Sequence, residues 1–430
     1  MIIVIDTFVC FAQIVFGQVV MNYLKRCAES LISTHMDNRR AIFILGPRQV
    51  GKTTLLKHLM EVNGYDNSLY YDIERQENLT LFSGSLEGII AKFRNDRINH
   101  KSRICIFIDE IQNIPDFSKT IKLLVDHYSE EFKLILTGSS SSLIRQQFQE
   151  SLTGRKIEYI LYPLSFPEFC LFKQEEKIAE LLDKGYRQEE YYPLHLETDK
   201  MKTLMAEYMV FGGYPEVVLQ NNDKAKAELL NEIASTYILK DIRHIFQIER
   251  IDELNRLIRY LAINIGKEMN LNKISVEAGL KRPDVQNYVK VLESSYIISQ
   301  IVPFYSNPNN ELRKMPKSYF LDLGIRNILI NNLNSPDMRT DKGELFENMV
   351  FLNLLHKQDV LTKIQYWKNK YKQEIDFVVS RADELSAYEV KYGSDTDNHF
   401  TAFTKTYPQA KCRIVRFNYS YKENELPGYF

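Results

Sequence analysis

The chain has 430 residues, of which 44% are hydrophobic and 26% are charged, with a formal net charge of −1. This balance is that of a globular protein with enough apolar residues for buried cores, and at roughly 100–200 residues per domain it predicts two to four domains. The near-zero charge excludes a chain that binds polyanions over its whole surface, so any nucleic-acid contact has to be a local patch. Five widely spaced cysteines exclude a disulfide framework and a zinc motif, and they favour a cytoplasmic protein.

Residues 1–20 are almost wholly apolar, with Asp6 as their only charge. The stretch is about long enough to span a bilayer, but it lacks the basic start and the small-residue cleavage site of a signal peptide. It is a membrane anchor, a packed segment, or an extension created by a misplaced translation start. We favour the last interpretation, because Met21 begins an amphipathic helical pattern, and we therefore expect no membrane association.

Four short apolar runs alternate with helical stretches in the next part of the chain, predicted here as one domain over residues 21–165. The runs are Ala41–Gly46, Ser68–Ile73, Ile104–Ile111 and Phe132–Ser140. Uninterrupted apolar strands separated by helices predict an α/β fold with a parallel sheet that is covered on both faces.

The first of these runs leads into "GPRQVGKT", which fits the phosphate-binding pattern GxxxxGK[ST] between a strand and a helix. The glycines allow backbone N–H groups to surround phosphates, and the helix directs its positive N-terminus at them. We expect Lys52 to reach the β- and γ-phosphates of ATP and the Thr53 hydroxyl to ligate Mg²⁺. The predicted nucleotide-binding residues are Gly46, Pro47, Arg48, Gln49, Val50, Gly51, Lys52, Thr53 and Thr54.

A second motif, "FIDEIQ", ends the third apolar run. Asp109 stands where a Walker-B aspartate holds Mg²⁺, and Glu110 is placed to orient the attacking water. Ser139, after the fourth run, is either a sensor of the γ-phosphate or a helix N-cap. Arg155 is either an arginine finger or nucleotide sensor, or a solvated arginine near a turn.

Several phrases together, "AIFILGPRQVGKTTLL", "FIDEIQ", "LTGSSSSL" and "FGGYPEVV", resemble a group of prokaryotic AAA-type ATPases related to the archaeal-ATPase and STAND-like branches. The resemblance extends from about Met21 to the end of the chain. It implies an AAA-like module, a helical lid over residues 166–250, a winged helix over residues 251–318, and a C-terminal domain of unknown function that is nuclease-like.

Residues Leu271–Ile298 have the pattern of a helix-turn-helix with its turn near Gly279, and a winged hairpin is expected after it. In a DNA reader the second helix enters the major groove. The candidates for contact are Lys281, Arg282, Gln286, Asn287 and Lys290. Because the local charge is only slightly positive, contact with a protein is the open alternative.

The last part, predicted as a domain over residues 319–430, carries Glu347 on a helix, Asp376 on a strand, and Glu389 and Lys391 two residues apart on the next strand. This arrangement resembles the PD-(D/E)xK, or restriction-endonuclease-like, superfamily. In such sites the carboxylates hold Mg²⁺ against the scissile phosphate, and the lysine assists the attacking water. We expect the four side chains to converge on one possible metal site, without a firm expectation of DNA cleavage.

Residues Lys363–Lys372 interleave four lysines with Tyr366, Trp367 and Tyr371. That mixture suits contact with a nucleic-acid backbone together with base stacking. The alternative is an amphipathic strand with its lysines in solvent.

The predicted function is Mg²⁺-dependent ATP hydrolysis coupled to a C-terminal module that handles DNA or a protein partner. The alternative is a STAND-like signalling or defence switch, in which the nucleotide state regulates partner binding and the tail is not catalytic. Turnover distinguishes them, because a motor cycles steadily and a switch hydrolyses once per signal. The sequence determines neither the oligomeric state nor the physiological substrate.

Overall fold

A computed structural model gives the fold, and it describes residues 14–15, 18–19, 23–96, 103–139, 152–183, 198–236, 250–305, 315–382, 384–394, 399–418 and 425–430. The chain divides into two compact units, Met1–Tyr162 and Pro163–Phe430. The first boundary is close to the predicted one at residue 165. The predicted boundaries at residues 250 and 318 fall inside the second unit, and the latter cuts through strand β9 (Lys317–Phe320).

Of the apolar leader, only a short antiparallel pair, β1 (Ile14–Val15) with β2 (Gln18–Val19), belongs to the described residues. The choice among its three interpretations therefore stays a prediction. Across the described part of the chain, no helix is both long enough and apolar enough to cross a membrane.

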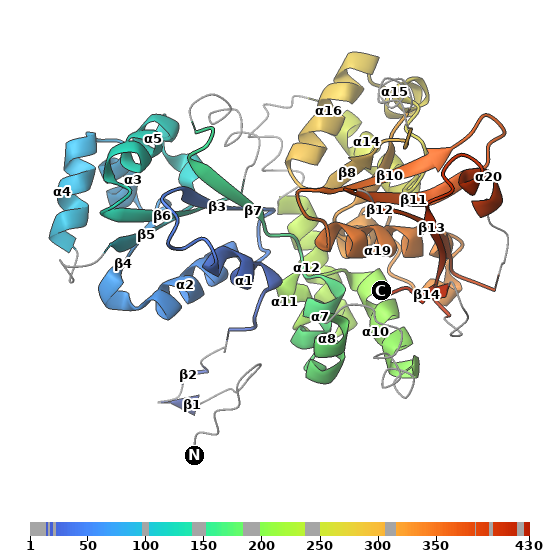
Figure 1. Ribbon diagram of the computed structural model, residues 1–430, viewed down its shortest axis with the longest axis horizontal. Coiled ribbons are helices and arrows are strands. Elements are labelled where there is room, and N and C mark those ends of the chain that lie inside the picture. The colour runs from blue at the N-terminus through green and yellow to red at the C-terminus, as the bar shows by residue number, and fades with distance from the viewer. Residues whose placement is uncertain are drawn as a thin grey trace. The chain divides into compact units, whose positions relative to one another are not determined.

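The first unit contains one five-stranded parallel sheet (Figure 1). Its strands, in spatial order, are β4 (Ser68–Asp72), β5 (Ile104–Asp109), β6 (Phe132–Gly138), β3 (Ala41–Leu45) and β7 (Lys156–Ile160). The predicted α/β fold with a parallel sheet is confirmed for this unit. The edge strand β7 was not predicted, because its residues are only half-buried and form no continuous apolar run.

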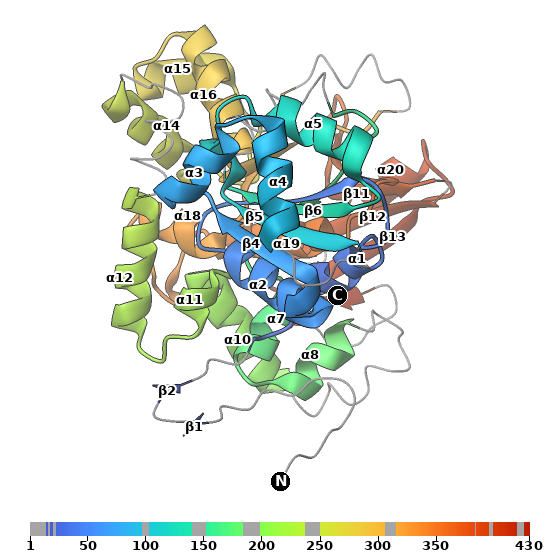
Figure 2. The ribbon, with the colours of Figure 1, turned by 90° about the vertical axis from the view of Figure 1, so that its left-hand side faces the viewer.

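Helices cover both faces of this sheet, as Figures 1 and 2 show. They are α1 (Cys27–Ser33), α2 (Lys52–Asn63), α3 (Gln76–Phe82), α4 (Leu86–Asp96) and α5 (Phe117–Tyr128), with 3-10 turns η1 (Tyr65–Asn67) and η2 (Ile111–Asn113). Helix α2 connects β3 with the edge strand β4. Helices α3 and α4 connect β4 with β5, and α5 connects β5 with β6, which is the opposite direction across the sheet. Because such crossovers are right-handed, α2 lies on one face of the sheet and α3 to α5 lie on the other. The carboxyl ends of β3, β6 and β5 consequently lie side by side.

The second unit begins with helices and a strand pair. The helices are α7 (Phe166–Phe172), α8 (Glu176–Asp183), α10 (Thr198–Phe211), α11 (Pro215–Val218), α12 (Asp223–Ile233), α14 (Ile251–Ile263), α15 (Leu271–Ala278) and α16 (Arg282–Ser294). Strand β8 (Ile298–Ile301) then pairs antiparallel with β9. Gly279, with φ 69°, caps α15 and forms the predicted turn before α16. Residues 306–314, where a wing was expected, lie outside the described residues.

A mixed five-stranded sheet ends the second unit, after α18 (Leu323–Leu329), the 3-10 turn η4 (Pro336–Met338) and α19 (Lys342–His356). Its strands are β10 (Thr362–Lys368), β11 (Glu374–Arg381), β12 (Glu384–Lys391), β13 (Lys411–Arg416) and β14 (Glu425–Pro427), with α20 (Phe400–Thr404) between β12 and β13. On one face, rings of α19 pack against the sheet, as Phe351 does against Phe377. On the other face, Phe403 of α20 packs edge-on against Trp367.

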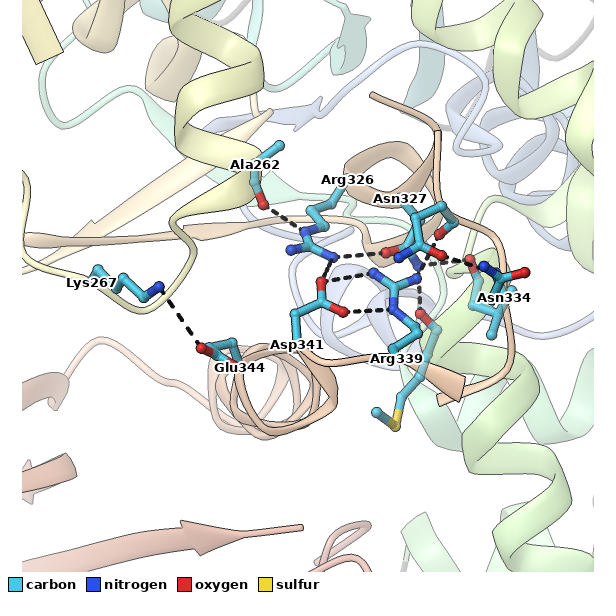
Figure 3. A network of polar contacts seen from close by, with 11 residues as sticks. Ala262, Lys267, Arg326, Asn327, Asn334, Arg339, Asp341 and Glu344 are labelled. Atoms are coloured by element: carbon cyan, nitrogen blue, oxygen red, sulfur yellow. Dashed lines mark hydrogen bonds and ion pairs between the residues drawn. The ribbon is translucent and has the colours of Figure 1, made fainter. Parts of the chain in front are cut away.

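Buried polar contacts join these parts into one unit. Arg326 of α18 donates to the carbonyl oxygen of Ala262 at 2.7 Å and forms an ion pair with Asp341 at 2.6 Å (Figure 3). Arg339 binds the same carboxylate through two nitrogens, at 2.8 and 2.9 Å. Two arginines thus hold one aspartate between α14, α18 and the start of α19, so the predicted domains of this region are not separate bodies.

Candidate nucleotide site

The loop between β3 and α2 has a backbone that requires glycine at two positions. Gly46 has φ 151°, and a side chain there would clash with the carbonyl oxygen of Leu161. Gly51 has φ 93°, in the left-handed region that side chains rarely adopt. The spacing of the two glycines in the motif therefore follows from the shape of the loop, which leads directly into the N-terminus of α2.

Arg26 supports this loop from outside the motif. Its side chain is buried and donates to the carbonyl oxygen of Val50 at 2.7 Å and to that of Tyr162 at 2.8 Å. The sequence analysis missed this residue, because a single arginine before a helix carries no signal of the loop that it contacts.

Lys52 is the first residue of α2 and is buried. Its ammonium donates to the carbonyl oxygens of Gly46 at 3.1 Å and Pro47 at 2.7 Å. Burial lowers the pKa of Lys52 to about 8, against the opposing influence of the Glu110 and Asp109 charges. A buried ammonium held by neutral carbonyls is suited to receive an anion, and a helix N-terminus beside it adds to that preference.

The remaining predicted nucleotide-binding residues occupy the loop and the first turn of α2. Pro47 and Val50 are buried, Arg48 and Thr53 are half-buried, and Gln49 and Thr54 are exposed. They are brought together because they are contiguous in the chain.

Asp109 is the last residue of β5 and is buried. One carboxylate oxygen accepts a hydrogen bond from the Thr137 hydroxyl of β6, and the other accepts one from the Tyr70 hydroxyl of β4 at 3.1 Å. Neighbouring strands on both sides therefore orient this carboxylate. Mg²⁺ prefers oxygen ligands and is usually bound through one or two carboxylates with substrate phosphates, so Thr53 and Asp109 fit it chemically.

Glu110 lies just beyond the end of β5, with a left-handed backbone (φ 58°). The buried Ser139, at the end of β6, donates to Glu110 Oε2 at 3.1 Å. The Gln112 amide nitrogen donates to Ser139 Oγ at 3.1 Å and also to Glu110 Oε2. Ser139 is thus brought to the predicted water-activating glutamate, while residues 140–151 after it lie outside the described residues.

Arg155 lies at the amino ends of the strands, opposite the end of the sheet that carries the phosphate-binding loop. It precedes β7, and its carbonyl oxygen accepts from the amide of Ala41, the first residue of β3, at 2.9 Å. The phosphate-binding loop begins after the five residues of β3, roughly 16 Å away. The guanidinium forms an ion pair with Asp126 of α5, which raises the pKa of Arg155. Strand direction therefore keeps Arg155 away from the loop of its own chain, and its role as an arginine finger stays a prediction that concerns a second copy of the chain.

The acids predicted to form a C-terminal metal site are divided between two places. Glu347 of α19 accepts from the Tyr319 hydroxyl at 2.5 Å and lies 3.5 Å from the ammonium of Lys317. Lys317 also forms an ion pair with Glu374 at 2.5 Å. Burial raises the pKa of Glu347 to about 7 and that of Asp376 to about 6, and in both cases the Lys317 charge opposes the rise.

Glu389 and Lys391 have their contacts on the side of α20. Glu389 Oε1 accepts from the backbone amide of His399 at 2.8 Å, and Oε2 lies 3.4 Å from the ammonium of Lys391. Alternation along β12 places both with Leu385 and Ala387, which pack in the core cluster that contains Phe403.

A bulge in β11 lies beside Asp376, whose Oδ2 accepts from the backbone amide of Val390, between Glu389 and Lys391, at 2.7 Å. Gln365 pairs with Val378 and Trp367 with Ile375, so a step of two residues in β10 matches a step of three in β11. Asp376 lies within electrostatic reach of Lys317, although the Glu389 charge also raises its pKa. Within the described ranges, no group of three or more His, Cys, Asp or Glu residues is arranged to hold a metal ion. Asp376 thus lies between the Lys317 cluster and the strand of Glu389 and Lys391, and the shared metal site of Glu347, Asp376, Glu389 and Lys391 stays a prediction.

The stretch Lys363–Lys372 forms β10 and the turn after it. Trp367 is buried against Phe403, and Tyr366 is buried with its hydroxyl donating to the carbonyl oxygen of Met315 at 2.6 Å. Neither ring is free to stack on a base, so the prediction of stacking is wrong for these two residues. Tyr371 alone of the three aromatic residues is exposed.

A groove of about 580 Å³ lies on the predicted helix-turn-helix. Its lining residues are Met269, Asn270, Leu271, Asn272, Arg282, Gln286, Val289, Lys290, Gln300, Met315 and Pro316. Three of the five predicted contact residues, Arg282, Gln286 and Lys290, belong to this lining, whereas Lys281 and Asn287 do not. The lining includes two cationic side chains, four carboxamides and no acid.

Three family profiles match consecutive parts of the chain. Residues 38–170 match a family described as an AAA domain, residues 202–336 match a domain of unknown function (DUF8612), and residues 342–426 match a domain of unknown function (DUF4143). The chain therefore joins an AAA-type P-loop domain to a DUF4143 domain.

Relatives and solved structures with similar chains are distant. An uncharacterized protein of Haemophilus influenzae is 25% identical over 395 residues, which cover 90% of both chains. An uncharacterized protein of Methanocaldococcus jannaschii is 25% identical over 342 residues, which cover 78% of this chain and 71% of the relative. Among solved structures, the Walker-type ATPase PABY2304 of Pyrococcus abyssi has a TM-score of 0.46 at 16% identity, and the alignment covers 71% of this chain and 96% of that one.

Proposed function

We propose that this protein binds ATP with Mg²⁺ at the loop 46–53 and hydrolyses it, and that the nucleotide cycle serves a DNA- or partner-handling C-terminal part. The proposal rests on the positions of three side chains at the carboxyl ends of strands β3 and β5. Lys52 is a buried cation without a carboxylate in hydrogen-bonding contact among the described residues, Asp109 is oriented by two hydroxyls, and Glu110 is held beside them.

Each of these groups has a role in phosphoryl transfer. Lys52 binds the β- and γ-phosphate oxygens, and Thr53 with Asp109 holds the cation. Bound Mg²⁺ would neutralise charge on the phosphate oxygens. Glu110 orients the attacking water and accepts its proton, while Ser139 fixes Glu110 and responds to the state of the γ-phosphate.

Steady-state ATPase rates and nucleotide affinity test the proposal in two variants. Glu110→Gln should bind ATP normally but hydrolyse it about 10²–10⁴-fold more slowly, because only water activation is lost. Lys52→Ala should lose binding itself. Arg155→Ala is the matched control and should keep the wild-type rate at low protein concentration, because Arg155 lies at the amino ends of the strands. Wild-type turnover by Glu110→Gln would refute the assignment of Glu110.

A second proposal concerns α14, α15 and α16 with β8 and β9, which we take as a winged helix that binds duplex DNA through α16. The acid-free lining of its groove supports this, since arginine and carboxamide side chains recognise base edges and lysine binds phosphates. We expect Arg282→Ala and Lys290→Ala each to weaken DNA binding and to reduce the log–log salt slope by about 1.

The control for that experiment is Lys224→Ala, which removes an exposed cation of α12 outside the groove. Loss of affinity in the control equal to that in the groove variants would show non-specific attraction. Unchanged affinity and slope in the groove variants would instead assign the groove to a protein partner, as the signalling-switch alternative requires.

We also propose that the C-terminal domain is a non-catalytic module. Lys317 balances Glu347 and Glu374, whereas Glu389 pairs with Lys391 and accepts from the amide of His399. We expect no Mg²⁺- or Mn²⁺-dependent cleavage of linear or circular DNA beyond that of Asp376→Ala. Cleavage by the wild type alone would overturn this part.

A further inference from the structure

Gln112 has no role in the function proposed so far, yet its side chain is part of the site. It lies in η2, two residues after Glu110. Its amide nitrogen donates to both Glu110 Oε2 and Ser139 Oγ, the latter at 3.1 Å. Its carbonyl oxygen Oε1 is buried and has no hydrogen-bond partner among the described residues.

The orientation of the Gln112 amide follows from its neighbour. With the amide reversed, the carbonyl oxygen would lie against the carboxylate of Glu110, and two acceptors would repel each other. Most buried polar groups in proteins are hydrogen-bonded, so the unpaired carbonyl oxygen of Gln112 costs free energy. The hydrogen bond from its amide nitrogen to Glu110 outweighs that cost. A glutamine held in this way serves the carboxylate that it contacts.

The two oxygens of Glu110 are treated differently. Oε2 accepts from Gln112 and from the Ser139 hydroxyl, whereas Oε1 has no hydrogen-bond partner within the described residues. Two donors on one oxygen fix the rotation of the carboxylate. The other oxygen keeps its lone pairs for a proton, as a general base requires.

We propose that Gln112 is a positioning residue for ATP hydrolysis that acts through Glu110; this rests on the proposed ATPase function. Together with Ser139 it anchors Oε2, so that Oε1 accepts a proton from the attacking water. The water oxygen then bonds to the γ-phosphorus, and the bond from that phosphorus to the β–γ bridging oxygen breaks. The products are ADP and inorganic phosphate, and the proton on Glu110 returns to solvent.

The test uses Gln112→Leu, which keeps similar side-chain volume without the donor, in the full-length protein. We expect kcat to fall about 10–100-fold, as for a misplaced catalytic group, with KM and ATP affinity changed less than threefold. Gln112→Glu, which keeps the shape but sets two carboxylates against each other, should lose at least as much. Asn113→Leu, an exposed neighbour in the same turn, is the matched control and should keep the wild-type kcat.

A double variant separates action through Glu110 from other roles. In single-turnover experiments, adding Gln112→Leu to Glu110→Gln should slow hydrolysis less than twofold further, because residues that act as a unit are not additive. A further tenfold loss, or an equal loss in Asn113→Leu, would overturn the proposal. So would a change in ATP affinity with kcat unchanged.

The failure of this inference is distinguishable from failure of the proposed function. If the wild type binds ATP but shows no turnover that Glu110→Gln abolishes, the ATPase assignment itself fails. If the wild type turns over and Gln112→Leu matches it, only the role of Gln112 fails. Melting temperatures of all variants, measured with and without nucleotide, show whether each one is folded.

Discussion

Both units bury lysines, and Lys52 of the first unit and Lys317 of the second have opposite chemistry. Lys52 is 5% exposed and Lys317 is 3% exposed. Burial lowers the pKa of Lys52, whereas nearby carboxylates raise the pKa of Lys317 above its usual value despite burial. The difference comes from the partners, because Lys52 donates to peptide carbonyls and Lys317 forms ion pairs with Glu347 and Glu374.

This difference separates a binding site from an internal ion cluster. In the proposed ATP site an anion from outside the chain would balance Lys52, whereas Lys317 is balanced by the protein itself. The same holds for Asp341 in Figure 3, whose pKa is lowered by Arg339 and Arg326. Lys317 and Asp341 are thus balanced inside the second unit, whereas Lys52 contacts only peptide carbonyls beside the phosphate-binding loop.

The largest effect is expected for Lys317→Met. Removing the cation leaves the carboxylates of Glu347 and Asp376 without it, while Glu374 keeps its ion pair with Lys368, and the free energy of unfolding should fall by about 3–5 kcal/mol at pH 7.5. The loss raises the folded-state pKa of Glu347 and Asp376 further, and stability from a raised carboxylate pKa is lost as pH rises. The deficit should therefore shrink at pH 5.5, as measured by urea unfolding. Lys370→Met, at an exposed turn, is the control, and equal unfolding curves for all three proteins would refute the ion-cluster interpretation.

Lys52→Met should have the opposite profile. The loss of charged hydrogen bonds to phosphate should weaken ATP binding on the order of 100-fold, or about 3 kcal/mol. The free protein should become more stable by roughly 1–3 kcal/mol, because a buried ammonium with a lowered pKa opposes folding. Calorimetric titration with ATP and thermal unfolding measure the two effects. If Lys52→Met were less stable than the wild type and still bound ATP, Lys52 would be a structural cation like Lys317 and not a ligand-binding one.

The pH dependence of ATP affinity tests the Lys52 pKa directly. Protonated Lys52 binds phosphate, and in the free protein it loses its proton as pH rises through about 8. Affinity should therefore be constant below pH 7 and fall by up to about tenfold per pH unit above pH 8. Lys52→Met should show no such decline, so a parallel decline in both proteins would point to another group.

The smallest effect is expected for Tyr70→Phe. The Tyr70 hydroxyl donates to Asp109, an oxygen of which is also needed for Mg²⁺. Removing this donor leaves Asp109 less firmly oriented, which should raise the Mg²⁺ concentration for half-maximal ATPase activity about two- to fivefold, or roughly 0.5–1 kcal/mol. Tyr71→Phe is the matched control, since that hydroxyl donates to Asp96 instead. A lower Mg²⁺ requirement for Tyr70→Phe would show instead that the Tyr70 hydroxyl competes with the cation for Asp109.

Local patterns in the sequence were sufficient for the phosphate-binding loop and for most of the secondary structure. A loop that surrounds phosphates is contiguous in the chain, so the spacing of Gly46, Gly51 and Lys52 is enough to identify it. The apolar runs of β3, β5 and β6 are predictable for the same reason, since a strand buried on both faces needs apolar residues throughout. The turn at Gly279 is equally local.

Contacts between distant segments were decided only by the tertiary structure. Ser139 lies beside Glu110 because β6 is the neighbour of β5 in the sheet. Arg155 lies at the amino ends of the strands because β7 is parallel to β3. In the second unit, a lysine 30 residues before Glu347 in the chain forms ion pairs with Glu347 and Glu374 that no local pattern indicates. Spacing along a strand predicts which residues share a face only where the strand has no bulge. It does not predict a counter-ion on another strand, such as Lys317 on β9. The sequence by itself therefore determined the chemistry that is contiguous, and packing decided which distant charges meet.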